Sequence, residues 1–191
     1  MGNAGDGLGN GYGEGYINMA LSGEYLGMDV YVDDLDLENL AFYQHCGDHV
    51  LHVQKCTACD LLRLPPTTAC PFCSHADSTW VSVSGKGTVY SYGKVHHAIQ
   101  PAFREHTPYL LLLVELDEQK DKPSPYDGLR LQSNLVTSTA DLATHGEVAK
   151  VGIGSRVRVV FKNIGEGIAM PLWTLDEEAE QPNPWHYGSA Q

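Results

Sequence analysis

The sequence predicts a mainly β protein with one short helix near its N-terminal end, and three patterns support this fold class. After residue 79, short runs alternate between polar and apolar residues, as half-buried strands do, and turn residues separate them. Helical features are confined to residues 33–43 and a short stretch near Leu142. Four of the five cysteines lie between residues 56 and 73, which indicates a cross-linked or metal-bound segment.

Charge divides the 191-residue chain into a neutral centre and two acidic ends. Residues 1–45 contain eight acidic residues, residues 176–191 contain four, and neither segment contains Lys or Arg. We predict four segments, which are a Gly-rich acidic extension, a helix with the cysteine pairs, a barrel and an acidic tail (1–32, 33–78, 79–175 and 176–191). The acidic ends either keep the protein soluble or dock on a basic partner, and they repel a polyanion such as nucleic acid.

The helix is predicted over residues 33–43. Asp33 or Asp34 caps its N-terminus, and acidic residues occupy the first turn, where the helix dipole favours negative charge. Leu37 and Leu40 share one face, which we expect to pack on the rest of the protein. A short strand over residues 49–55 then leads into the first cysteine pair.

The cysteine pairs have the spacing C-x2-C-x10-C-x2-C, formed by Cys56, Cys59, Cys70 and Cys73. Each pair can present two thiolates to one metal ion, and a structural Zn²⁺ site takes four such ligands in a tetrahedron. An all-cysteine set leaves no position open for water or substrate, so we predict a structural zinc rather than a catalytic one. The alternatives are iron in a rubredoxin-like site, or two disulfides in an oxidising compartment.

The remaining polar residues give no evidence of a catalytic site. The sequence contains no G-x-S-x-G, phosphate loop or H-E-x-x-H motif, and no catalytic residue is predicted. We interpret Glu115 and Asp117 as solvated charges at a strand end, and Cys46 as a free thiol. The histidines that we interpret as ordinary polar or structural positions are His45, His49, His52, His75, His96 and His97. Three cations could contact a phosphate group, namely Lys86, Lys94 and Arg104. The spacing of these residues in the sequence does not favour any one of them.

The strands after the cysteine pairs predict a small barrel, closed or partly open. The run 109–117 is strongly apolar and is expected to be a central strand, whereas Pro171 indicates that the last strand lies at an edge. The predicted strands cover residues 80–84, 88–97, 109–117, 128–138, 154–163 and 168–175.

We expect a cytoplasmic protein with no membrane association. The longest apolar run, residues 110–114, is far shorter than the roughly 18 residues of a membrane-spanning helix. The N-terminus has neither the basic nor the apolar region of a signal peptide, and Asp6 occupies the position where a myristoylation motif has Ser or Thr. A reducing compartment also agrees with thiols that bind metal.

A series of short motifs between about residues 40 and 175 resembles the thiolase-associated zinc-ribbon/OB-fold family. Each motif alone is weak, but their order and spacing together are specific. The motifs are QKCTAC (54–59), LPP (64–66), CPFC (70–73), WVSVSGKGTVYSY (80–92), PY (108–109), VELD (114–117), IG (153–154) and VRV (157–159).

This resemblance implies a rubredoxin-like zinc ribbon followed by a five-stranded OB-fold barrel. It also implies a non-catalytic subunit that stabilises a thiolase-like catalytic subunit, in a heterotetramer or larger hetero-oligomer, and that helps to bind an acyl-CoA substrate. Among the branches of the family, we favour the accessory subunit of an aldolase that shortens steroid side chains by retro-aldol cleavage of a β-hydroxyacyl-CoA. The N-terminal extension is longer than a minimal acetyltransferase partner needs.

A scaffold that makes no contact with CoA stays open as a version of this role, and three other functions stay open as well. The first is an accessory subunit of a thiolase or acyltransferase complex. The second is an OB-fold module that binds single-stranded nucleic acid, which the absence of net positive charge in the centre of the chain disfavours. The third is an enzyme that acts without a partner.

Overall fold

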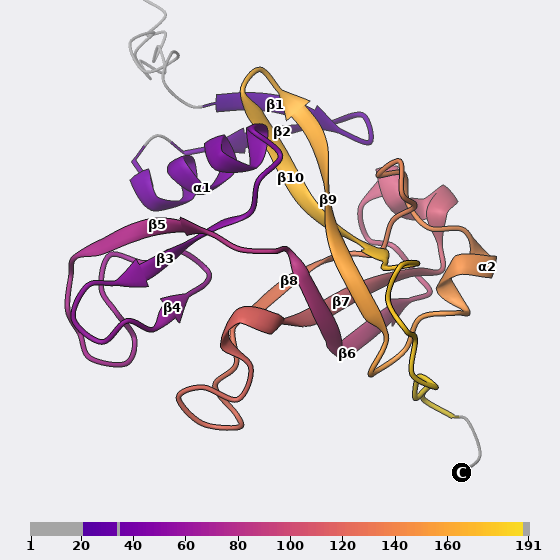
Figure 1. Ribbon diagram of the computed structural model, residues 1–191. Helices are drawn as coiled ribbons and strands as arrows, with labels where there is room; N and C mark the ends of the chain where they lie inside the picture. Colours follow the sequence, from indigo (N-terminus) through magenta and orange to yellow (C-terminus); the bar gives the residue numbers. More distant parts are fainter. Residues whose placement is uncertain (1–20, 34, 189–191) are drawn as a thin grey trace, which may run out of the picture.

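The described strands form three antiparallel sheets in a computed structural model, which describes residues 21–33 and 35–188 (Figure 1). A two-stranded sheet contains β1 (Leu21–Tyr25) and β2 (Met28–Val32). A three-stranded sheet has the order β4 (Leu62–Arg63), β3 (His52–Cys56), β5 (Ser78–Ser82). A five-stranded sheet has the order β10 (Ile168–Leu175), β9 (Arg156–Gly165), β6 (Lys86–Val95), β7 (Tyr109–Leu116), β8 (Arg130–Asn134). The helices are α1 (Leu37–Gly47), η1 (Pro101–His106), η2 (Asp117–Gln119) and α2 (His145–Val148).

The five-stranded sheet curls so that its two edge strands, β8 and β10, approach each other. Leu135, just after β8, forms an isolated parallel bridge with Trp173 of β10. The Val136 N–H donates to the Trp173 carbonyl at 2.7 Å, and the Ser133 hydroxyl donates to the Pro171 carbonyl at 2.6 Å. One bridge replaces a continuous ladder, so the predicted mainly β fold is confirmed and the barrel is partly open.

The main core lies inside this curled sheet. Strand β7 matches the apolar run expected to be central, and it lies between β6 and β8. Its inward residues Leu112 and Val114 are fully buried, as are Val157 of β9 and Trp173 of β10. Burying one such side chain stabilises the fold by about 1.5–3 kcal/mol. Pro171, which cannot donate to a ladder, lies in the edge strand β10, as predicted.

Helix α1 begins later than the sequence pattern indicated. Its N-cap is Asp36, whose carboxylate accepts the Asn39 N–H at 3.1 Å, whereas the Asp33 carboxylate accepts the Leu35 N–H at 2.9 Å in the preceding turn. The helix buries Phe42 and Cys46. Local capping patterns allowed several starting points, and the apolar face that packs on the core selected the later one.

The run 80–84, predicted to be the first strand of the barrel, belongs to the smaller sheet. Its first part is β5, which pairs with β3 in the register Gln54↔Trp80. The two sheets therefore meet after Ser82. Alternation of polar and apolar residues identified the strand, but it cannot specify which sheet a strand joins.

Both predicted end segments contribute to the folded body. Residues 21–32 of the predicted extension form the β1–β2 hairpin, which lies against β9 so closely that a side chain at Gly23 would collide with the Ile164 carbonyl. In the predicted acidic tail, Trp185 forms an antiparallel bridge with Ile153. The Gly-rich residues 1–20 lie outside the described residues. None of the helices within residues 21–33 and 35–188 is long and apolar enough to cross a membrane.

Candidate metal centre

The four cysteines predicted to bind metal come together at one end of the three-stranded sheet. Their sulfur atoms all lie within 4.8 Å of one another, and the Cys56–Cys73 and Cys59–Cys70 Sγ–Sγ distances are both 3.6 Å. A tetrahedral site with Zn–S bonds of about 2.3 Å has sulfur–sulfur edges of about 3.8 Å. These separations fit a metal site and exceed a disulfide bond of about 2.05 Å.

Each cysteine pair is held in the same backbone conformation. The N–H of the fifth residue, Asp60 or Ser74, donates to the carbonyl of the first cysteine, at 3.1 Å for Cys56 and 2.8 Å for Cys70. Asp60 and Ser74 have φ values of 61° and 63°, in the left-handed region that reverses the chain. The first cysteine of each pair also donates its own N–H to the sixth residue's carbonyl, at 3.0 and 2.8 Å. Two equivalent turns therefore present their thiols to one point.

Backbone N–H groups prepare two of these thiols for metal binding. Hydrogen bonds from the backbone N–H groups of Cys59 and Ala58 lower the pKa of Cys56. Burial opposes ionisation of Cys70, but backbone hydrogen bonds from Phe72 and Cys73 lower its pKa to about 6. Because a metal binds the thiolate and not the thiol, these bonds favour metal binding at Cys56 and Cys70, whereas burial and neighbouring sulfurs raise the pKa of Cys59 and Cys73.

The sulfur cluster has the composition of a structural site. Cys56 and Cys70 are buried, Cys59 is half-buried and Cys73 is exposed. Four cysteine ligands complete a tetrahedral shell, which leaves no position for a substrate. The residues therefore fit zinc with a structural role, and they would hold the loops of a small sheet whose strands are two to five residues long.

A buried polar network that the sequence analysis did not identify supports these loops. Gln54 is 4% exposed, and its side-chain oxygen accepts the Arg63 Nε–H at 2.9 Å and the Thr67 N–H at 2.8 Å. The Arg63 Nη2 group donates to the Ala76 carbonyl at 3.3 Å. Gln54 and Arg63 lie opposite each other on β3 and β4, so the network connects both strands to the segments that carry Cys70 and Cys73. No sequence pattern indicated this network, because β3 (HVQKC) contains other polar residues and β4 is only two residues long.

Replacement of Gln54 by leucine should lower the free energy of unfolding by about 2–4 kcal/mol, because it leaves the buried Arg63 donor and the partly buried Thr67 N–H without an acceptor. Urea unfolding and the rate of zinc loss to a chelator would measure the effect. Gln54→Glu is the matched control, since it keeps the acceptor and adds a negative charge beside Arg63. Equal losses in both variants would show that the hydrogen-bond acceptor is not what Gln54 contributes.

A second buried glutamine attaches the ribbon to the larger sheet. Gln119, which is 5% exposed, lies in η2 after β7. Its side-chain oxygen accepts the Leu62 N–H at 2.6 Å, and its side-chain nitrogen donates to the Leu62 carbonyl at 2.8 Å. This pair of bonds continues the edge of β4 and couples the order of the metal-binding loops to the barrel.

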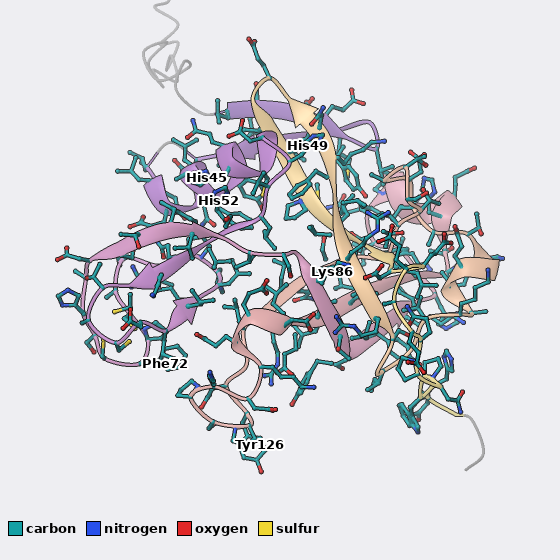
Figure 2. The ribbon with its side chains drawn as sticks, viewed as in Figure 1. His45, His49, His52, Phe72, Lys86 and Tyr126 are labelled. Atoms are coloured by element: carbon teal, nitrogen blue, oxygen red, sulfur yellow. The ribbon has the colours of Figure 1, made fainter. Side chains whose placement is uncertain are left out.

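None of the nearby histidines belongs to the sulfur cluster, as interpreted from the sequence. The His45 and His52 rings stack with centroids 4.3 Å apart, between α1 and β3 (Figure 2). Burial, together with His52, lowers the pKa of His45. The His49 ring stacks on Phe161. Cys46 is completely buried, and this burial raises its pKa to about 12, so its thiol is unreactive.

The acidic pair on β7 and η2 differs from the sequence interpretation. Glu115 is not a solvated charge, because it is 8% exposed and pairs with Arg130 at 3.0 Å. Asp117 pairs with Arg156, whose hydrogen bonds lower the pKa of Asp117. Glu115 joins the neighbouring strands β7 and β8, and Asp117 joins η2 to β9, so both acids are held in ion pairs and neither is available as a general acid or base.

The fold and the sulfur cluster define a zinc-ribbon protein with an OB-fold domain. Comparison with protein-family models gives two matches. Residues 43–79 match the rubredoxin-like zinc ribbon domain of ChsH2, and residues 80–162 match the C-terminal OB-fold domain of ChsH2. The chain belongs to the ChsH2 family of zinc-ribbon/OB-fold proteins, whose domain is also called DUF35.

Individual relatives agree with this assignment. A chain of a solved structure, "Ltp2-ChsH2(DUF35) aldolase", is 31% identical with a TM-score of 0.58, and the match covers 75% of this chain and 98% of that chain. A probable enoyl-CoA hydratase alpha subunit of Thermomonospora curvata is 37% identical over 73% of this chain. The match covers only 38% of that relative's length. A DUF35 domain-containing scaffold protein of Methanocaldococcus jannaschii is 29% identical over 59% of this chain and 67% of its own.

Proposed function

We propose that this protein is a zinc-binding, non-catalytic accessory subunit of a thiolase-like aldolase. The aldolase cleaves a β-hydroxyacyl-CoA by a retro-aldol reaction in the degradation of steroid side chains. The observation that carries this proposal is the 31% identity with the ChsH2(DUF35) chain of an aldolase complex, over 98% of that chain. The role of the zinc is to fold the ribbon with its three-stranded sheet, and that of the barrel, formed by β6 to β10, is to provide the surface on which the catalytic subunit docks.

The side-chain environments support a non-catalytic role. The Cys46 thiol is buried, Glu115 and Asp117 are held in ion pairs, and the candidate zinc site has a complete shell. The scaffold function named for the M. jannaschii relative is compatible with such a subunit. We propose an assembly in the cytoplasm that contains two or more copies of each chain, with the CoA thioester bound mainly by the catalytic subunit.

A pull-down of the tagged chain from its source cells, followed by native mass spectrometry, tests this proposal. We expect a stable assembly with a thiolase-sized protein and one zinc ion per copy of this chain. Identification of an acyltransferase in the assembly would favour the alternative branch of the family. A zinc-loaded chain that elutes alone would contradict the accessory role, and salt-sensitive retention on single-stranded DNA would then support the nucleic-acid alternative.

A further inference from the structure

The C-terminal segment, residues 185–187, forms one wall of a cavity beside β6. The Ile153 and Trp185 backbones exchange two hydrogen bonds of 2.9 Å, and the Tyr187 N–H donates to the Tyr92 hydroxyl at 3.0 Å. Gly152 permits this approach, because a side chain there would collide with the Trp185 carbonyl. Figure 1 shows the C-terminal segment passing between β6 and α2. The backbone of the segment is therefore held beside β6, and Trp185 and Tyr187 lie next to the cavity.

The cavity exists because β6 is paired on only one side over most of its length. Strand β6 pairs with β7 as far as Val95, but it pairs with β9 only over Lys86–Thr88. Val89 still bonds to the backbones of Gly154 and Ser155. Beyond Val89, the open edge of β6, the segment 148–153 and the C-terminal segment enclose about 620 Å³. This volume lies within the range of about 300–1,000 Å³ that is typical of small-molecule sites.

The lining of the cavity has an aromatic part and a cationic part. Trp185 is 44% exposed and Tyr187 is 88% exposed, and their rings lie at 77° to each other with centroids 6.5 Å apart. Lys94 and His96 are the basic residues that β6 and the following turn contribute. The floor is apolar and includes Leu110, Val148 and Val151.

The cavity has no negative charge in its lining, although the chain has a net charge of −12. Among the described residues, Lys94 forms no ion pair, whereas Lys86 pairs with the buried Asp176 at 3.4 Å. A cation without a partner, beside exposed aromatic rings, fits a ligand that has both a flat ring and an anionic group. A nucleoside phosphate has these properties, because its base stacks on aromatic side chains and its phosphates attract lysine.

We propose that this cavity binds the phosphorylated adenosine end of a CoA thioester, with the adenine against Trp185 and Tyr187 and a phosphate beside Lys94. The choice of CoA as the source of the nucleotide rests on the proposed function. The geometry selects Lys94 from the three cations that the sequence offered for a phosphate contact. This chain would then hold the nucleotide end of the substrate while the catalytic partner acts on the acyl end.

Isothermal titration calorimetry of the full-length chain with 3′,5′-ADP, 5′-ADP and coenzyme A tests the proposal. We expect coenzyme A and 3′,5′-ADP to bind with similar affinity. Trp185→Ala should weaken binding by about 5- to 150-fold through lost stacking. Lys94→Ala should weaken it by at least about threefold and reduce its salt dependence. Lys122→Ala, on the β7–β8 loop, is the matched control and should bind like the unmodified chain.

Three results would overturn the proposal. These are no heat of binding with any of the three ligands, equal affinities in the unmodified chain and the Trp185→Ala and Lys94→Ala variants, or tighter binding of oligo(dT) than of coenzyme A. Tyr187→Ala provides a second test should Trp185→Ala be unstable, since Tyr187 is almost fully exposed. All of these measurements use the isolated chain, so a negative result leaves the pull-down of a catalytic partner unaffected, and failure of the pull-down leaves nucleotide binding measurable.

Discussion

Replacement of Cys56 or Cys70 by serine should abolish zinc binding and complex formation together. Both residues are buried, and backbone hydrogen bonds help to lower the pKa of each thiol. Apparent binding free energies of structural zinc sites are about 10–16 kcal/mol, which exceeds what a three-stranded sheet of two- to five-residue strands can supply by packing. Metal content, measured by mass spectrometry, and co-elution with the catalytic partner are the two measurements.

Cys46→Ala is the matched control for this experiment. Cys46 is as buried as Cys56, but it lies in the main core and its sulfur is not part of the cluster. The control should retain one zinc ion and the partner, with a modest loss of stability. A Cys56→Ser chain that has lost its zinc but still assembles fully would show that the ribbon is not needed for docking. A chain that retains iron rather than zinc would identify the rubredoxin-like alternative.

Replacement of Trp173 by alanine should lower the free energy of unfolding by about 3–5 kcal/mol. Trp173 is completely buried, its carbonyl accepts the Val136 N–H, and its indole N–H donates to the Leu131 carbonyl at 3.3 Å. The side chain therefore fills the core at the point where β10 approaches the end of β8. Its loss should open the barrel, and urea unfolding of the zinc-loaded chain would measure the change.

Trp173→Phe separates the two contributions of this residue. Phenylalanine keeps most of the buried ring but loses the indole donor, so its destabilisation should be less than half that of alanine. A loss of under about 1 kcal/mol in Trp173→Ala would contradict the central place of this contact in the core. Zinc content should be unchanged in both variants, because the metal site lies at the three-stranded sheet and Trp173 lies in the five-stranded sheet.

The metal site was predictable because its information is local. The spacing of Cys56, Cys59, Cys70 and Cys73 determines which atoms can meet, and two short equivalent turns bring them together. The strands of the barrel were predictable for the same reason, since alternation of polar and apolar residues reports which face of each strand is buried. The apolar run 109–117 corresponds closely to β7.

Contacts between distant segments were not predictable from these patterns. The position of β5 beside β3, the bridge between Trp185 and Ile153, and the burial of Glu115 against Arg130 each depend on how separate segments pack. In sequence terms, Trp185 and its neighbours have the composition of a solvated acidic tail. The backbone hydrogen bonds to Ile153 and the bond to the Tyr92 hydroxyl hold this segment, and both partners lie far from it in the sequence.

Aldolase turnover in a reconstituted complex tests the accessory-subunit account most directly. The purified chain, the proposed thiolase-like partner and their mixture would each be incubated with a β-hydroxyacyl-CoA that has a steroid side chain. The release of the shortened product would be measured. The account predicts no turnover by this chain alone, weak or unstable activity of the partner alone, and full activity only in the zinc-loaded mixture. Turnover by this chain alone, or partner activity that this chain does not change, would contradict it.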